Sequence, residues 1–280
     1  MSDVFSCEND CLEDVARLAG ELDIGWWASD GPTGGYLVAL ALQVASGACV
    51  PSGIVPRSVD FHVLGPAVAG AFQARVTIER ASDELALSTV VLEQARPFAV
   101  AHVFFSSHRG AQAPADGRPP PVFPAEVYAQ LSSSSGSLPP VARQFVFRPT
   151  TEPDGSAPMP GWDAVWIEPV RRHAPGRAAV AAMIDSWYPP NHMRAVREFL
   201  QGGVTPLDEP PATTLLGGRV TFAAPEGSYD DVACALLVSR IAAIVDGHYF
   251  EDSEIWSSDG ELLIKAELMR RNALVPTAVG

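Results

Sequence analysis

Apolar residues along the first half of the chain form one continuous run and then several alternating segments. Residues 33–42 are apolar nearly all round a helix, which predicts a helix enclosed by other elements rather than lying on the surface. Segments that alternate apolar and polar residues follow, and a period of two predicts strands. These segments are residues 57–64, 71–80, 85–94 and 98–106. The pattern therefore predicts one buried helix followed by an antiparallel sheet.

The second half repeats this order. Residues 178–187 predict a helix, which Pro189-Pro190 should end because proline cannot continue it. Strand patterns recur at residues 219–223, 235–245, 248–256 and 261–269. Ser257-Ser258-Asp259-Gly260 is typical of a hairpin turn between the last two strands. A helix followed by an antiparallel sheet, occurring twice, predicts an α+β fold built from two similar halves.

The middle of the chain has a different composition. Residues 109–140 are rich in Ala, Pro, Gly and Ser, and include Arg118-Pro119-Pro120-Pro121 and a run of four serines at 132–135. Such a segment cannot bury a core and is typical of a linker. We predict an N-terminal domain at 1–110, a linker at 111–140 and a C-terminal domain at 141–280.

Composition excludes several classes of protein. The chain has 280 residues, of which 47% are hydrophobic and only 19% charged, and this excludes disorder for most of its length. Its 33 acidic and 19 basic residues give a net charge of −14, and Lys265 is the only lysine. Nucleic acid is excluded as a partner because its phosphates need clustered basic residues.

No export or membrane signal is expected either. The N-terminus begins Met1-Ser2-Asp3-Val4, without the basic and apolar regions of a signal peptide. The longest apolar stretch, residues 36–50, is shorter than the ~20 residues that a spanning helix needs. The four cysteines make no CxxC pair or disulfide framework, and no set of His, Cys, Asp and Glu has metal spacing. We expect a cytoplasmic protein without metal or cofactor.

Several segments resemble one protein family, in the same order along nearly the whole chain. In the first half they are Asp23-Ile24-Gly25-Trp26-Trp27, Gly31-Pro32-Thr33-Gly34-Gly35-Tyr36-Leu37 and Pro56-Arg57-Ser58-Val59-Asp60-Phe61-His62-Val63-Leu64-Gly65-Pro66. In the second half they are Asp185-Ser186-Trp187-Tyr188-Pro189-Pro190, Glu251-Asp252-Ser253-Glu254-Ile255-Trp256 and Asp259-Gly260-Glu261-Leu262-Leu263. The chain resembles the double-hotdog acyl-CoA thioesterases of the thioesterase II-like superfamily.

The resemblance implies a double hotdog, in which each antiparallel sheet wraps around a long central helix and the two sheets join across a pseudo-twofold axis. It also implies acyl thioesters as ligands, with the acyl chain buried between the halves. In related hotdog enzymes the thioester carbonyl is polarised at the helix start, which corresponds here to Gly34 and Gly35. Free N–H groups and the helix dipole favour an oxyanion there. Alternatively, the two glycines only let the chain turn and pack.

The catalytic side chains depart from the family pattern. The resemblance implies an Asp eight residues before the strand-ending Pro225, and this position is Gly217, or Arg219 if the register slips by two. The family's hydroxyl has a counterpart in Ser239, whereas its Gln position is Leu268. Gly and Leu can neither bind nor activate water. Hydrolysis at the usual place in the second half is therefore in doubt.

The strand at 57–64 offers a substitute. Ser58, Asp60 and His62 share one of its faces, with Val59 and Phe61 on the other, because alternate residues of a strand point the same way. Asp60 and His62 can act as a general base with its orienting partner, or as an acid and base pair. The alternative is that the apolar face meets the core and the polar face meets water.

Aromatic residues lie beside both predicted helices. Trp26 and Trp27 precede the first helix, with Tyr36 inside it, and Trp187 and Tyr188 follow the second. Large aromatic faces at the junction of the halves suit an apolar acyl or polyketide chain, so we predict that these five residues bind substrate. The alternative is that they close the ends of the two sheets.

Three functions remain open. The first is hydrolysis of an acyl thioester with a hydrophobic acyl or polyketide-type chain, catalysed by Asp60, His62 and Ser239. The second is a cyclase, dehydratase or isomerase of natural-product biosynthesis on the same fold. The third is a non-catalytic acyl-binding protein. In each case the partner is a small hydrophobic molecule, carried as a coenzyme A or carrier-protein thioester, and a homo-oligomer is compatible with all three.

Overall fold

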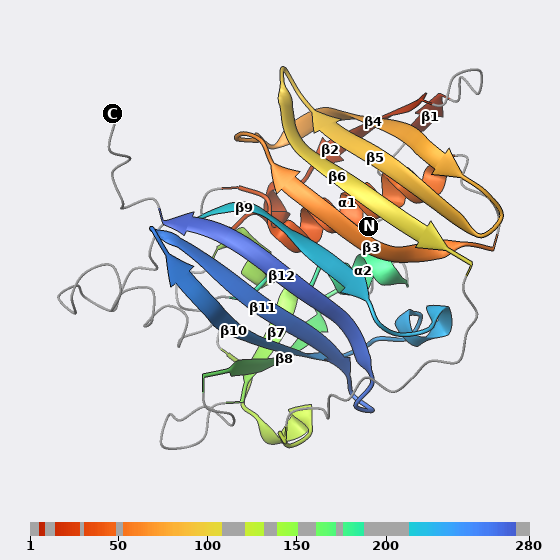
Figure 1. The fold of residues 1–280 in the computed structure, drawn as a ribbon. Coiled ribbons are helices and arrows are strands. Elements are labelled where there is room, and N and C mark those ends of the chain that lie inside the picture. The colour runs from red at the N-terminus through yellow and green to blue at the C-terminus, as the bar shows by residue number, and fades with distance from the viewer. Residues whose placement is uncertain are drawn as a thin grey trace.

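One antiparallel sheet dominates the molecule. The computed structural model describes residues 6–8, 15–28, 31–48, 53–107, 121–131, 139–150, 161–171, 176–187 and 213–272. Within these ranges twelve strands form a single sheet in the order β1-β2-β4-β5-β6-β3-β9-β12-β11-β10-β8-β7. Figure 1 shows both helices behind this sheet. None of the helices in these ranges is long and apolar enough to cross a membrane.

The first half contains the long helix and six strands. Its elements are β1 (Ser6–Glu8), β2 (Val15–Leu22), the short 3-10 helix η1 (Ile24–Trp26), α1 (Gly34–Gly47), β3 (Val55–Val63), β4 (Gly70–Ala81), β5 (Leu85–Glu93) and β6 (Pro97–Ser106). The four predicted strands are confirmed to within two residues at each end. Helix α1 is also confirmed, and it is buried nearly all round, as its apolar sequence predicts. Its first turn is capped by Thr33, whose hydroxyl accepts the Tyr36 N–H at 3.3 Å.

The second half contains a shorter helix. Its elements are the 3-10 helices η2 (Ala125–Val127), η3 (Pro140–Arg143) and η4 (Glu226–Tyr229), the helix α2 (Arg177–Ala181), and the strands β7 (Phe145–Pro149), β8 (Asp163–Pro169), β9 (Thr213–Phe222), β10 (Ala235–Val245), β11 (His248–Ser257) and β12 (Leu262–Asn272). The predicted helix at 178–187 is too long. The chain turns after Ala181, and Asp185 has φ 62°, which an α-helix does not allow. Tyr188, Pro189 and Pro190 lie outside the described residues.

Strands β3 and β9 join the two halves into one sheet. They pair antiparallel from Ser58 opposite Thr221 to His62 opposite Gly217, and Figure 1 shows them side by side. Two glycines of β9 allow close approach of its neighbours, Gly217 on the side of β3 and Gly218 on the side of β12. A Cβ atom on Gly217 would lie 2.4 Å from the Phe61 carbonyl oxygen, and one on Gly218 would lie 2.4 Å from the Glu267 carbonyl oxygen. Only glycine fits at either position without moving a neighbouring strand.

The two helices pack against each other at the centre of the core. A Cβ atom on Gly35 would lie 2.3 Å from the Ile184 carbonyl oxygen and 2.4 Å from that of Ala181. The first turn of α1 therefore lies directly against the end of α2. Away from this core, residues 121–131 cover a second apolar cluster, where the Trp166 Nε1–H donates to the Phe123 carbonyl at 3.0 Å.

Candidate functional site

Asp60 and His62 lie on the face of the sheet that points away from the helices. Val59 and Phe61, which alternate with them on β3, are almost fully buried. His62 is exposed, whereas Asp60 is half-buried and its Oδ1 accepts from Arg219 Nε at 2.5 Å. The structure thus brings Asp60 together with Arg219 and not with the start of α1.

Asp60 belongs to a row of polar side chains that crosses the sheet. In this row each residue lies directly opposite the next on the neighbouring strand, and the row runs Thr89, His102, Asp60, Arg219, Glu267, Asp252 and Arg240. A second ion pair joins its last two members, and the distance between Arg240 Nη2 and Asp252 Oδ2 is 2.8 Å. Exposed ion pairs of this kind are screened by water and contribute little to stability.

The start of α1 faces a buried carboxylate instead. The Gly34 N–H donates to Asp185 Oδ2 at 2.8 Å, and the exposed fraction of Asp185 is 5%. Asp185 comes from the turn after α2, which the close packing at Gly35 brings here. An anion is favoured at a helix N-terminus by the free N–H groups and the helix dipole. The Gly35 N–H, next along the helix, has no acceptor within the described ranges.

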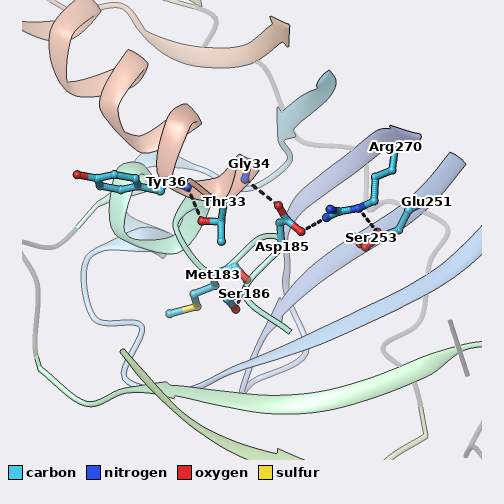
Figure 2. A network of polar contacts seen from close by, with 9 residues as sticks. All are labelled: Thr33, Gly34, Tyr36, Met183, Asp185, Ser186, Glu251, Ser253 and Arg270. Atoms are coloured by element: carbon cyan, nitrogen blue, oxygen red, sulfur yellow. Dashed lines mark hydrogen bonds and ion pairs between the residues drawn. The ribbon is translucent and has the colours of Figure 1, made fainter. Parts of the chain in front are cut away.

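Arg270 links this carboxylate to a second one. Its Nη2 forms an ion pair with Asp185, and its Nε lies 3.4 Å from Glu251 Oε2. All three side chains are buried, with exposed fractions of 5% for Asp185, 4% for Arg270 and 7% for Glu251. Figure 2 shows Asp185 between Gly34 and Arg270, with Glu251 and Ser253 on the far side of the guanidinium. We refer to Asp185, Arg270, Glu251 and Ser253 as the buried network.

Glu251 is a buried carboxyl group with a raised pKa. Burial raises its pKa from the ordinary 4.5 to about 7, because the charged form loses its hydration. The Ser253 hydroxyl donates to Glu251 Oε1 at 2.9 Å and lowers this pKa, whereas the nearby Asp252 and Asp163 raise it. No group of three His, Cys, Asp or Glu in the described part of the chain can hold a metal ion.

The buried network lies beside the positions where the family pattern is broken. Leu268, at the position where the resemblance implies a Gln, is directly opposite Glu251 in the sheet. Arg270 follows two residues later on the same buried face of β12. Ser239 is also buried and lies opposite Ser253. The structure thus gathers polar side chains around the predicted hydroxyl, although Asp and Gln are absent from their usual places.

The aromatic residues form a chain of ring contacts that crosses from one half to the other. Tyr36 stacks on Trp26 with ring centroids 5.3 Å apart, and Trp26 contacts Phe145 of β7 at 5.8 Å. Phe145 contacts Phe147 at 5.9 Å, and Phe147 contacts Trp187 at 5.0 Å. Trp26 and Tyr36 are buried in the core.

Two of the predicted aromatic residues remain partly accessible. Trp27 and Trp187 are half-buried and pack against the main core. Tyr188 lies outside the described residues.

None of the four members of the network was predicted as a catalytic residue, although the sequence holds a signal for each. Asp185 ends the apolar run that forms α2, where an isolated acid has to find a buried partner. Glu251 and Ser253 occupy the same face of their strand as Tyr249 and Ile255, which are buried. Arg270 shares a face with Leu268. The sequence alone does not show that these faces come together in the folded protein.

The segment that contains Gly34, Gly35 and β3 corresponds to a known domain. Residues 24–106 match the acyl-CoA thioesterase N-terminal domain. This match confirms the resemblance found in the sequence motifs. A search of curated proteins gives no significant match.

Solved structures share the fold of both halves of this chain. A hot dog fold protein of unknown function from Alicyclobacillus acidocaldarius has a TM-score of 0.80 at 18% identity, covering 96% of each chain. An acyl-CoA thioesterase II, TesB2, from Mycobacterium marinum has a TM-score of 0.68 at 15% identity, covering 95% of each chain. The dehydratase domain of RzxB from Pseudomonas fluorescens has a TM-score of 0.56 at 12% identity, covering 95% of this chain and 96% of that domain. These likenesses confirm the double-hotdog α+β fold.

Proposed function

We propose that the chain is an acyl-thioester hydrolase and that Asp185 is the base that activates water. The observation that supports this assignment most directly is the buried Asp185 carboxylate, held at the start of α1 by the Gly34 N–H and by Arg270. The guanidinium compensates the charge of the carboxylate and so favours the ionised form of Asp185. The match to an acyl-CoA thioesterase domain supports a thioester as the substrate.

The reaction follows from these groups. The thioester carbonyl binds at the Gly35 N–H, where the helix dipole stabilises the negative charge that develops on its oxygen. Asp185 removes a proton from a water molecule as the water oxygen bonds to the carbonyl carbon. The tetrahedral intermediate then collapses, the carbon–sulfur bond breaks, and the leaving thiolate takes up the proton. The products are a carboxylic acid and a free thiol, and one water is consumed.

Trp27 and Trp187 are the residues that we propose for binding the acyl chain. Both are half-buried and pack against the main core, so part of each side chain remains accessible. Trp26 and Tyr36 stack on each other within the core and help to position the start of α1. A net charge of −14 favours a substrate bound mainly through its apolar chain, as a coenzyme A or carrier-protein thioester.

The experiment that tests this function compares Asp185→Asn with Asp60→Asn on a panel of acyl thioesters, with thiol release as the readout. We expect Asp185→Asn to lower kcat by about 10²- to 10⁴-fold, the usual contribution of a general base. Asp60→Asn should retain activity, because Asp60 lies on the opposite face of the sheet from Gly34. Loss in Asp60→Asn with retention in Asp185→Asn would instead favour Asp60 and His62 on the outer face of the sheet.

A dehydratase is a second candidate, and the two unlike carboxyl groups of the network favour it. Asp185 is paired with a cation, whereas the pKa of Glu251 is raised to about 7. Carboxyl groups whose environments separate their protonation are typical of acid and base pairs, which the removal of water needs. Loss of water from a 3-hydroxyacyl thioester, followed by mass spectrometry, would identify this activity. Acyl binding without turnover of any thioester would indicate the non-catalytic alternative and overturn both enzymes.

A further inference from the structure

Arg270 is shared between two buried carboxyl groups, and only one of them has a part in the hydrolysis proposed above. Its Nη2 forms an ion pair with Asp185, and its Nε lies 3.4 Å from the Oε2 atom of Glu251. Glu251 is held in place by the Ser253 hydroxyl at 2.9 Å. Because the guanidinium is rigid and planar, a change in its bond to one carboxyl group changes its bond to the other.

The charges around Arg270 do not balance when both carboxyl groups are ionised. Two negative charges then face one positive charge among side chains that are all less than one-tenth exposed. Asp163 of β8, which is 5% exposed, and Asp252 next to Glu251 add further negative charge. Uncompensated charge in such a place is costly, so the network retains one proton. Glu251 is its site, because Asp185 also accepts the Gly34 N–H.

We propose that Glu251 is a positioning residue whose protonation determines how firmly Arg270 holds Asp185. This proposal rests on the role of Asp185 as the base. With a neutral Glu251, Arg270 interacts mainly with Asp185 and fixes that carboxylate at the start of α1. When Glu251 loses its proton, it attracts Arg270 and weakens the Arg270–Asp185 ion pair. Asp185 then becomes a stronger base, and thioester hydrolysis accelerates.

The dependence on pH follows from the burial of Glu251. Its pKa of about 7 places the change of state in the neutral range. The wild-type kcat should therefore rise several-fold through a step centred near pH 7. The hydrogen bond from Ser253 lowers the pKa of Glu251, so its removal should raise this pKa and move the step to higher pH.

The test uses Glu251→Gln, with Glu267→Gln as the matched control. The first variant keeps the shape of the side chain but cannot ionise. The second removes one exposed carboxylate on the outer face of β12. In Glu251→Gln we expect the pH profile of kcat to lack the step near pH 7, whereas Glu267→Gln should retain this step. A step that persists in Glu251→Gln would overturn the proposal. Should Glu251→Gln fail to fold, Ser253→Ala takes its place, and an unmoved step would overturn the proposal equally.

A readout that does not depend on turnover separates this proposal from the proposed function. In protein labelled with ¹³C at the Asp and Glu carboxyl carbons, signals are assigned by comparison with Asp185→Asn and Glu251→Gln. We expect the Asp185 signal to shift with the same midpoint as Glu251, and to lose that shift in Glu251→Gln. An inactive protein with this coupling would overturn the hydrolase alone. An active protein whose Asp185 signal does not shift with the titration of Glu251 would overturn the positioning role alone.

Discussion

The burial of Glu251 predicts a pH dependence of folding stability that can be calculated. The pKa of this carboxyl group rises from the ordinary 4.5 to about 7 in the folded protein. A raised pKa means that the folded state binds the proton more tightly than the unfolded state does. The stabilisation from this tighter proton binding is complete below the pKa that Glu251 has in the unfolded chain. It is lost as the pH rises from there through the pKa that Glu251 has in the folded protein. Each pKa unit corresponds to about 1.4 kcal/mol, so Glu251 costs about 3 kcal/mol of stability at alkaline pH.

Urea denaturation of the wild type and Glu251→Gln measures this effect, since the variant has no proton to lose at that position. Between about pH 5.5 and about pH 8, the wild type should lose about 2 kcal/mol relative to Glu251→Gln. Glu267→Gln, which removes an exposed carboxylate, should keep a constant difference from the wild type across the same range. A difference between the wild type and Glu251→Gln that does not change with pH would refute the raised pKa.

Two further predictions concern packing and charge in the core, and urea denaturation checks both. Gly35→Ala should lose about 1–3 kcal/mol of stability, because its methyl group would lie 2.3 Å from the Ile184 carbonyl oxygen. Gly47→Ala, at the open end of α1, should gain up to about 1 kcal/mol of stability. Equal effects of the two changes on stability would contradict the packing argument. Arg270→Met should lose about 3–5 kcal/mol by leaving two buried carboxyl groups without their cation. Combining it with Asp185→Asn should recover part of this loss, and no recovery would show that the charges are not coupled.

Periodicity in the sequence was sufficient to predict most of the sheet and the long helix. The strand at 235–245 coincides with β10, and the Asp259-Gly260 turn joins β11 to β12 as predicted. Strands β1, β2, β7 and β8 were not predicted, because short segments become strands here through pairing with neighbours. The length of α2 was also not predictable, since the positive φ of Asp185 reflects its contacts in the folded core.

The candidate site was less accessible to prediction from the sequence. Alternation along β3 placed Asp60 and His62 on one face, but it does not say whether that face meets a ligand or water. The start of α1 was recognised from Gly34 and Gly35, whereas its partner Asp185 comes from a distant segment. Arg270 and Glu251 meet only because β11 and β12 pair in a particular register. Contacts of this kind depend on tertiary structure, which no local pattern contains.

The close pairing of β3 and β9 at Gly217 also limits where a carboxylate can be introduced. The resemblance to the thioesterase family implies an aspartate at this position, but its Cβ atom would lie 2.4 Å from the Phe61 carbonyl oxygen. A carboxylate placed here by one substitution would therefore push β3 and β9 apart. A catalytic acid has to come from another position in the core, as Asp185 does in the proposed site.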